Sequence, residues 1–304
     1  MVQDFIAAAI AQHALPPDFT DTVTRWYLPL AEKITAQARQ LNRPLVLGIQ
    51  GTQGSGKSTL ADFLRLIFEH QYQLSCVSLS IDDFYLTRAE RAQLAETAHP
   101  LLITRGVPGT HDVQLAIDTI EQLTGARSAS DGNPVNLVRF NKAVDDRAPE
   151  SDWDEVQAPV DIVILEGWCV GLRAEESRAL IPPLNDLERI EDRDASWRLH
   201  VNNQLAYQYP KLFNMLDRLV VLKAPSFECV YQWRLLQEKK LEDKCRQEGT
   251  STDKILSPAQ VSRFISHYQR LTEHGLRTLP LLADWTLPLN ADHQICEILE
   301  KDPA

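Results

Sequence analysis

Residues 51–58 read Gly-Thr-Gln-Gly-Ser-Gly-Lys-Ser and carry the clearest chemical signal in the chain. Their spacing is G-x-x-x-x-G-K-[ST], the pattern of a phosphate-binding loop, or P-loop. The glycines let backbone N–H groups turn inward around a polyphosphate, and the N-terminus of a following helix adds partial positive charge. Lys57 is expected to reach the β- and γ-phosphates, and the Ser58 hydroxyl is expected to bind Mg²⁺.

The segments that flank this loop have the order that the motif needs. Residues 45–49 form an apolar run typical of a buried strand, and residues 59–68 carry apolar side chains at helical spacing. The alternative, a glycine-rich turn followed by a chance Lys-Ser pair, does not account for this strand–loop–helix order. We infer that the chain binds a nucleoside triphosphate. The residues expected to contact it here are Gly51, Thr52, Gln53, Gly54, Ser55, Gly56, Lys57, Ser58 and Thr59.

Carboxylates follow two other apolar segments. Glu166 comes directly after residues 160–165 and is placed to bind Mg²⁺ or its waters; the alternative is a glutamate that merely ends a strand. Asp82 and Asp83 end the predicted strand at residues 74–81, and a carboxylate beside an acceptor hydroxyl is the usual base in phosphoryl transfer. Successive strand residues face opposite ways, so only one aspartate should face the γ-phosphate. An Asp-turn or a helix cap is the alternative for this pair.

Cationic side chains gather in the predicted loops near the same edge. Arg105, Arg139, Lys142 and Arg147 could neutralise the charge that develops during phosphoryl transfer, although a single loop cation is more often solvated surface. His111, taken alone, is more often a packing or capping residue than a ligand.

Composition excludes several classes of function. The chain has 304 residues, 44% of them hydrophobic, and a net charge of −11, whereas nucleic-acid binding needs clustered Lys and Arg. Five scattered cysteines without a C-x-x-C pair indicate a reducing cytoplasm and no zinc site. The first residues lack the basic region of a secretory signal, and no apolar run approaches the ~20 residues of a membrane span. We expect a cytoplasmic protein with a small-molecule partner and neither nucleic acid nor membrane; the oligomeric state stays open.

Alternating strand and helix patterns predict an α/β fold with a parallel sheet covered by helices on both faces. The expected strands are residues 45–49, 74–81, 135–140, 160–165, 218–222 and 285–289. The expected helices are residues 4–14, 18–41, 86–98, 113–123, 183–216, 226–247 and 258–274, with Pro29 kinking or splitting the second and Asp112 capping the fourth. Residues 141–157 and 249–255 are predicted to be loops.

Such sheets bind ligands at the carboxyl ends of their strands. Lys57, Asp82, Arg139 and Glu166 all fall at or just past those predicted ends, so we expect them to converge on one site. Residues 1–43 should form helices that pack outside a core made by residues 44–304, in one compact domain.

Several motifs, taken together, resemble the P-loop small-molecule kinases, a superfamily that includes uridine kinase, phosphoribulokinase and bacterial pantothenate kinase. Their order favours the branch of the plant-type D-glycerate 3-kinases, over residues 44–275. The motifs are Ser-Ile-Asp-Asp-Phe-Tyr at 80–85, Arg-Gly-x-Pro-Gly-x-His-Asp at 105–112, Arg-Phe-Asn-Lys at 139–142, Asp-Arg-Ala at 146–148, Leu-Glu-Gly-Trp at 165–168 and Tyr-x-Trp-Arg-Leu at 231–235.

The resemblance implies an ATP- and Mg²⁺-dependent kinase with a P-loop fold and a helical lid near residues 226–275. It implies catalytic roles for Lys57, Asp82 as the base and Glu166, a metal site at Ser58 and Glu166, and a lid arginine, Arg234, near the ATP phosphates. The substrate-side residues that it implies are Asp82, Tyr85, Arg105, His111, Lys142 and Arg147. His111 stands where pantothenate kinases tend to have Tyr, which fits a smaller acceptor.

Other functions remain open from the sequence. D-glycerate, phosphorylated to 3-phosphoglycerate, leads among acceptors, with pantothenate, uridine or a sugar phosphate as alternatives. A GTP switch needs N-K-x-D, but Val144 occupies the aspartate position after Asn141 and Lys142. A non-catalytic P-loop nucleotide-binding protein would leave Asp82 and Glu166 without an evident task.

Overall fold

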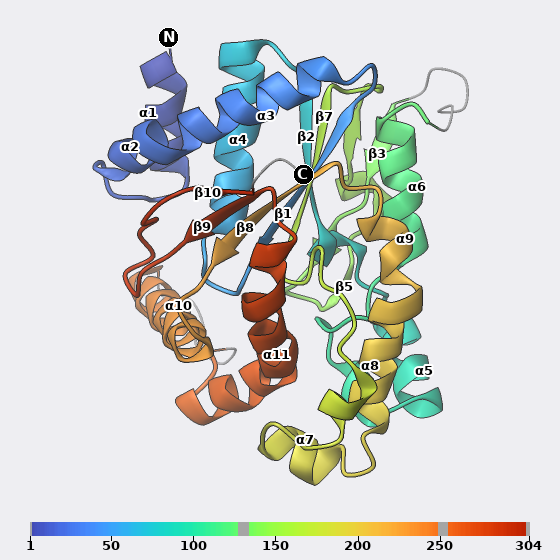
Figure 1. Ribbon diagram of the computed structural model, residues 1–304. Helices are drawn as coiled ribbons and strands as arrows, with labels where there is room; N and C mark the ends of the chain where they lie inside the picture. Colours follow the sequence, from blue (N-terminus) through green and yellow to red (C-terminus); the bar gives the residue numbers. More distant parts are fainter. Residues whose placement is uncertain (1, 127–133, 249–254, 302–304) are drawn as a thin grey trace.

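The computed structural model describes residues 2–126, 134–248 and 255–301. A six-stranded sheet runs through its centre, with strand order β10-β9-β8-β1-β7-β2 (Figure 1). Neighbouring strands are parallel except for the pair β9 and β10. The strands are β1 (Leu45–Gly51), β2 (Cys76–Ser80), β7 (Ile162–Gly167), β8 (Arg218–Lys223), β9 (Trp285–Pro288) and β10 (Leu299–Glu300). The mostly parallel sheet expected from the sequence is therefore confirmed.

Side chains of the central strands alternate between two hydrophobic cores. Leu45, Leu47 and Ile49 of β1 enter one core, whereas Val46 of the same strand enters the other. All seven residues of β1 are buried, as expected for a strand covered on both faces. This double burial explains why β1 and β7 read as continuous apolar runs.

The N-terminal helices and the P-loop helix cover one face of the sheet (Figure 1). They are α1 (Val2–Gln12), α2 (Phe19–Thr22), α3 (Leu28–Gln40) and α4 (Lys57–Tyr72). A π-helical turn at Val23–Tyr27 separates α2 from α3, and Pro29 lies in the first turn of α3. The backbone keeps helical angles from α2 to α3, so the helix predicted at residues 18–41 is not broken at Pro29. Its hydrogen bonding is π-helical just before this proline, which has no N–H to donate.

A second group of helices lies on the opposite side of the sheet (Figure 1). They are α5 (Arg88–Thr97), α6 (Val113–Leu123), α7 (Asp186–Glu191), α8 (Ser196–Tyr207) and α9 (Tyr209–Phe213). The Asp112 carboxylate accepts a hydrogen bond from the Leu115 amide at 3.0 Å, so the predicted cap of α6 is confirmed. Short 3₁₀ helices lie at Ile81–Phe84, Pro100–Ile103, Glu150–Asp152, Ser177–Leu180 and Leu279–Leu281.

Helices α10 (Phe227–Glu248) and α11 (Pro258–Thr278) pack against each other beside the sheet (Figure 1). A capping box at Ser257 and Gln260 starts α11. Most of the loop predicted at residues 249–255 lies outside the described residues. Among the described residues, no helix has both the length and the apolar character needed to cross a membrane.

Residues 135–157 fold differently from the prediction. The expected strand at residues 135–140 breaks into β3 (Val135–Leu137), which pairs antiparallel with β6 (Asp154–Val156), and β4 (Phe140–Asn141), which pairs antiparallel with β5 (Asp146–Arg147). Neither pair joins the central sheet, and the predicted loop at residues 141–157 contains β5 and β6. The placement of Arg139 at a strand end of the parallel sheet was therefore wrong. An apolar run alone cannot distinguish a central strand from a short ribbon packed beside it.

Candidate active site

The P-loop connects the end of β1 to the first residue of α4. Gly54 and Gly56 have φ values of +77° and +85°, a backbone conformation that side chains other than glycine rarely adopt. A Cβ atom on Gly51 would overlap Ser55 Oγ, so the loop closes tightly there. The side-chain oxygens of Thr52 and Ser55 are buried and form no hydrogen bond with any described residue. Together with the N-terminus of the long helix α4, these features fit an anion.

Ser58 and Glu166 come together from α4 and β7. The Ser58 hydroxyl donates a hydrogen bond to Glu166 Oε1 at 2.9 Å, and Glu166 is only 6% exposed. Its other oxygen, Oε2, is buried, and none of the described residues forms a hydrogen bond with it. A buried carboxylate oxygen is costly without a cation or a donor, so this pair fits the hard, oxygen-binding Mg²⁺ ion.

Asp82 lies in the 3₁₀ turn at Ile81–Phe84, directly after β2. The Tyr85 hydroxyl donates to its Oδ1 at 2.8 Å, and Lys142 Nζ donates to its Oδ2 at 2.7 Å. Burial would raise the pKa of Asp82, but the charges of Lys142 and Lys57 outweigh burial and hold that pKa below its usual value. Asp82 is therefore an ionised carboxylate within electrostatic range of the P-loop lysine.

Asp83 has different partners from Asp82. Its carboxylate accepts hydrogen bonds from Arg139 Nη1 at 3.0 Å and from the Phe140 amide at 3.2 Å. Burial raises the pKa of Asp83, although the Phe140 amide and the Arg139 charge act in the opposite direction. The two aspartates do face different neighbours, but the reason is the 3₁₀ turn and not the alternation of a strand. Asp83 anchors the start of β4.

His111 lies against the segment that carries Asp82. Its backbone pairs with Tyr85 in an isolated antiparallel bridge, and its ring stacks on the Tyr85 ring with centroids 4.6 Å apart. His111 Nδ1 is 2.5 Å from the Tyr209 hydroxyl, whereas Nε2 is buried and has no hydrogen-bond partner in the described part of the chain. Burial lowers the pKa of His111 to about 4, against the opposing charge of Asp82. The imidazole is thus neutral near pH 7.

The three candidate cations of the substrate side differ in their partners. Arg105 forms an ion pair with Asp145 and lies over the Phe140 ring. Lys142 pairs with Asp82 and is 60% exposed. Arg147 Nη2 lies 3.6 Å from the Asp112 carboxylate, and within the described residues neither Nη2 nor the buried Nε has a hydrogen-bond partner. Of the three, Arg147 offers the donors most in need of an anionic oxygen.

Known proteins resemble this chain over most of its length. The uncharacterized kinase mug58 of Schizosaccharomyces pombe is 34% identical over 245 residues, which cover 76% of this chain and 81% of that protein. The chloroplastic D-glycerate 3-kinase of Arabidopsis thaliana is 32% identical over 245 residues, 78% of this chain; the match spans about half (48%) of the plant protein. The solved D-glycerate 3-kinase from Cryptococcus neoformans var. grubii serotype A has a TM-score of 0.74 and 25% identity, covering 90% of this chain and 99% of that one.

This chain belongs to the same family of P-loop kinases. The kinase is an ATP-dependent phosphotransferase, and the P-loop fold expected from its sequence is confirmed. No protein-family model matches the chain.

Helix α10 brings an aromatic side chain to the P-loop of the kinase. A Cβ atom on Gly54 would lie 2.8 Å from Trp233 Cβ. The Trp233 ring stacks on His293 with centroids 4.3 Å apart, and His293 Nδ1 is 2.9 Å from the Gly54 carbonyl oxygen. Trp233 belongs to a motif that the sequence singled out, but no pattern in the sequence distinguishes His293.

Arg234 lies one residue further along α10 and is directed toward α11. Its guanidinium pairs with Glu238 and lies 5.5 Å from the centre of the Phe264 ring. The partners of this arginine in the structure are therefore an acidic neighbour on α10 and an aromatic ring of α11.

Tyr209 and Asp145 are the neighbours of site residues that sequence reasoning missed. Tyr209 contacts His111, and Asp145 pairs with both Arg105 and Arg91. Asp145 has a φ of +58°, which suits the tight turn between β4 and β5. The Asp-rich turn of residues 144–146 could have suggested a hairpin, but no local signal connects Tyr209 to His111.

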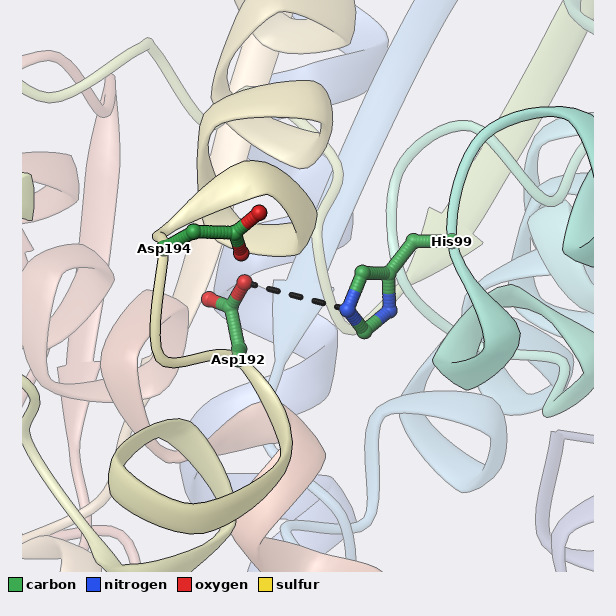
Figure 2. Close-up of side chains that lie close together, drawn as sticks. All are labelled: His99, Asp192 and Asp194. Atoms are coloured by element: carbon green, nitrogen blue, oxygen red, sulfur yellow. Dashed lines mark ion pairs between the residues drawn. The ribbon is translucent and has the colours of Figure 1, made fainter.

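Away from this site, His99, Asp192 and Asp194 approach one another at the start of α8 (Figure 2). Asp192 accepts hydrogen bonds from the Trp197 amide at 2.8 Å and from Arg198 Nη1 at 2.8 Å. His99 Nδ1 accepts from the Leu101 amide, which leaves the proton of a neutral ring on Nε2, the atom facing Asp192 at 3.9 Å. A metal would need that nitrogen unprotonated, so this group is better explained as a helix-capping network.

Proposed function

We propose that the kinase transfers the γ-phosphoryl group of ATP to a hydroxyl of a small carboxylate-bearing alcohol, with D-glycerate forming 3-phosphoglycerate as the first choice. The observation that carries this proposal is a set of buried nitrogens on the acceptor-side segments that have no hydrogen-bond partner among the described residues, namely His111 Nε2 and the Nε and Nη2 atoms of Arg147. An acceptor with a carboxylate supplies oxygens to such donors. Two of the relatives described above are named D-glycerate 3-kinases, which supports the same acceptor.

On the ATP side, Lys57 and the P-loop amides would hold the β- and γ-phosphates. Ser58 and Glu166 would hold Mg²⁺, which when bound supplies charge neutralisation for the transferring phosphoryl group. We also propose that α10 and α11 form the lid, so that Arg234 exchanges Glu238 for an ATP phosphate on closure. In this proposal residues 1–43 buttress the kinase domain of residues 44–304.

On the acceptor side, Asp82 would take the proton of the attacking hydroxyl. The hydroxyl oxygen forms a bond to the γ-phosphorus while the bond from that phosphorus to the β–γ bridging oxygen breaks, which releases ADP. Each oxygen of Asp82 has two lone-pair sites, so the hydroxyl can bind beside Tyr85 or Lys142. The low pKa of Asp82 keeps it ionised, and it suits a loose transition state in which proton transfer is late.

Initial rates of ADP release test the acceptor. The initial rate with D-glycerate should exceed the rates with L-glycerate, pantothenate and uridine. Glycerol is the matched control, because it keeps the hydroxyls and lacks the carboxylate. Correlated ¹H–³¹P spectra of the product should place the phosphoryl group on the terminal hydroxyl. A clear preference for glycerol or uridine would overturn the proposal of a carboxylate-bearing acceptor. If no acceptor raised the rate of ADP release above that with ATP alone, the result would favour a non-catalytic or regulatory nucleotide-binding protein.

A further inference from the structure

Tyr209, at the start of α9, makes a side-chain contact with His111 that has no role in the proposed phosphoryl transfer itself. It is fully buried, its hydroxyl oxygen accepts a hydrogen bond from the Gly109 amide at 3.0 Å, and the same oxygen lies 2.5 Å from His111 Nδ1. Burial raises the pKa of Tyr209 well above its usual value, so the phenol keeps its proton. The contact joins α9 to the loop that carries His111.

The hydrogen bonds at the Tyr209 hydroxyl decide which atom donates in its contact with His111 Nδ1. The Gly109 amide can only donate, so the phenol oxygen is an acceptor there. If His111 Nδ1 also donated, the phenol proton would have no acceptor among the described residues. Tyr209 must therefore donate to Nδ1, and the proton of the neutral imidazole is on Nε2.

His111 Nε2–H is then a buried donor for which the described residues supply no hydrogen-bond acceptor. It lies on a ring stacked against Tyr85, whose hydroxyl donates to Asp82 at 2.8 Å. Native structures leave few such donors unsatisfied, and those that persist commonly bind a ligand or a water. The position next to the Asp82 segment points to the acceptor molecule.

We infer that Tyr209 is a positioning residue that holds His111 as its Nε2–H tautomer, so that His111 donates a hydrogen bond to an oxygen of the acceptor. This inference rests on the proposed acceptor site beside Asp82. It makes His111 a neutral donor and not a proton acceptor, which leaves Asp82 as the base. It also defines the ligand chemistry at Nε2: a carboxylate, carbonyl or hydroxyl oxygen fits, and a donor group such as an ammonium does not.

The tautomer can be measured without any substrate. Two-bond ¹H–¹⁵N correlations of the histidine rings, with His111 assigned by its loss in His111→Asn, should show a protonated Nε2 and an unprotonated Nδ1. A wild-type spectrum with the proton on Nδ1 would overturn the inference, whatever the acceptor proves to be. A failure of D-glycerate as substrate with the expected tautomer would instead count against the proposed function.

Tyr209→Phe tests the positioning role, since it removes one hydroxyl and keeps the ring that packs on Phe213. We expect the KM for the acceptor to rise on the order of 10-fold, the loss of about one hydrogen bond, while the KM for ATP changes less than about twofold. The matched control is Tyr27→Phe, which removes the hydroxyl of another buried tyrosine on the opposite face of the sheet and should leave both KM values unchanged. If the two variants changed the acceptor KM equally, Tyr209 would contribute only to the general stability of the fold.

Two substitutions at His111 give a test that does not depend on the folding of Tyr209→Phe. A glutamine amide can place its N–H₂ near the position of Nε2, whereas an alanine cannot. His111→Gln should keep the acceptor KM closer to wild type than His111→Ala. If both variants raise that KM equally, Nε2–H is not the group that binds the acceptor.

Discussion

The two halves of the candidate site are built in different ways. On the nucleotide side, backbone geometry dominates: two glycines have positive φ and the loop ends at a helix N-terminus, with one side-chain contact, Ser58–Glu166, joining α4 to β7. On the acceptor side, side chains from separate segments meet, as in the Lys142–Asp82 and His111–Tyr209 contacts. The first half is suited to any nucleoside triphosphate, and the second half is where an acceptor can be selected. A substitution on the nucleotide side should therefore change the KM for ATP, and one on the acceptor side should change the KM for the acceptor.

Asp82→Asn should give the largest effect, because the amide keeps the shape of the side chain but cannot accept the hydroxyl proton. We expect kcat to fall on the order of 10²- to 10⁴-fold with little change in ATP affinity, measured by steady-state rates and nucleotide titration. Asp83→Asn is the matched control and should cost far less, since Asp83 anchors Arg139 and Phe140. A dispensable Asp82 beside an essential Asp83 would reverse the assignment.

Lys57→Ala should remove the main side-chain contact to the transferring phosphoryl group. The expected loss in kcat is on the order of 10²- to 10³-fold, as for the removal of one transition-state electrostatic contact. Lys33→Ala, in an exposed ion pair with Glu300, controls for loss of a positive charge elsewhere. ATP turnover by Lys57→Ala within a few fold of wild type would contradict the role given to the P-loop.

Arg147→Ala and Arg105→Ala compare a guanidinium that has only a long contact to a carboxylate with one that is closely paired. Arg147 Nε and Nη2 are buried with no hydrogen-bond partner among the described residues, so loss of this side chain should raise the acceptor KM about 10- to 100-fold and leave the KM for ATP within about twofold. Arg105 is already paired with Asp145, so its loss should raise the acceptor KM less. Arg147→Lys should restore only part of the affinity, because an ammonium lacks the planar fork. A larger effect at Arg105 would mean that Asp145 releases it to the acceptor.

The smallest expected effect concerns stability against pH. The lowered pKa of Asp82 means that its contribution to folding is present above the unfolded value near 3.8 and is lost as pH falls through the lower folded value. The raised pKa of Asp83 acts in the opposite sense: its ionisation costs the folded state stability as pH rises above 3.8. Between pH 7 and pH 3, Asp82→Asn should lose less free energy of unfolding than wild type, and Asp83→Asn should lose more. Urea unfolding across this range measures the difference, and parallel curves for all three proteins would contradict it.

On the acceptor side of the site, the structure differs in two places from what the sequence predicted. The strand expected at residues 135–140 was placed in the central sheet because apolar runs of central strands and of outlying ribbons look alike. Arg139 nevertheless reaches Asp83 from the ribbon, so its nearness to the site came from a contact and not from a strand end. The different surroundings of Asp82 and Asp83 also follow from a 3₁₀ turn that the pattern of residues did not predict.

The sequence by itself determined the P-loop, the order of the strands and helices outside residues 135–157, and two carboxylates: Asp82, just after β2, and Glu166, near the end of β7. These features are local, because glycine positions, apolar periodicity and strand ends are written in neighbouring residues. The tertiary structure decided which partners surround each acceptor-side group: Asp145 is 40 residues from Arg105, and Tyr209 is 98 residues from His111. Such contacts depend on how distant segments pack, and no short-range pattern encodes which buried donor is left without a partner.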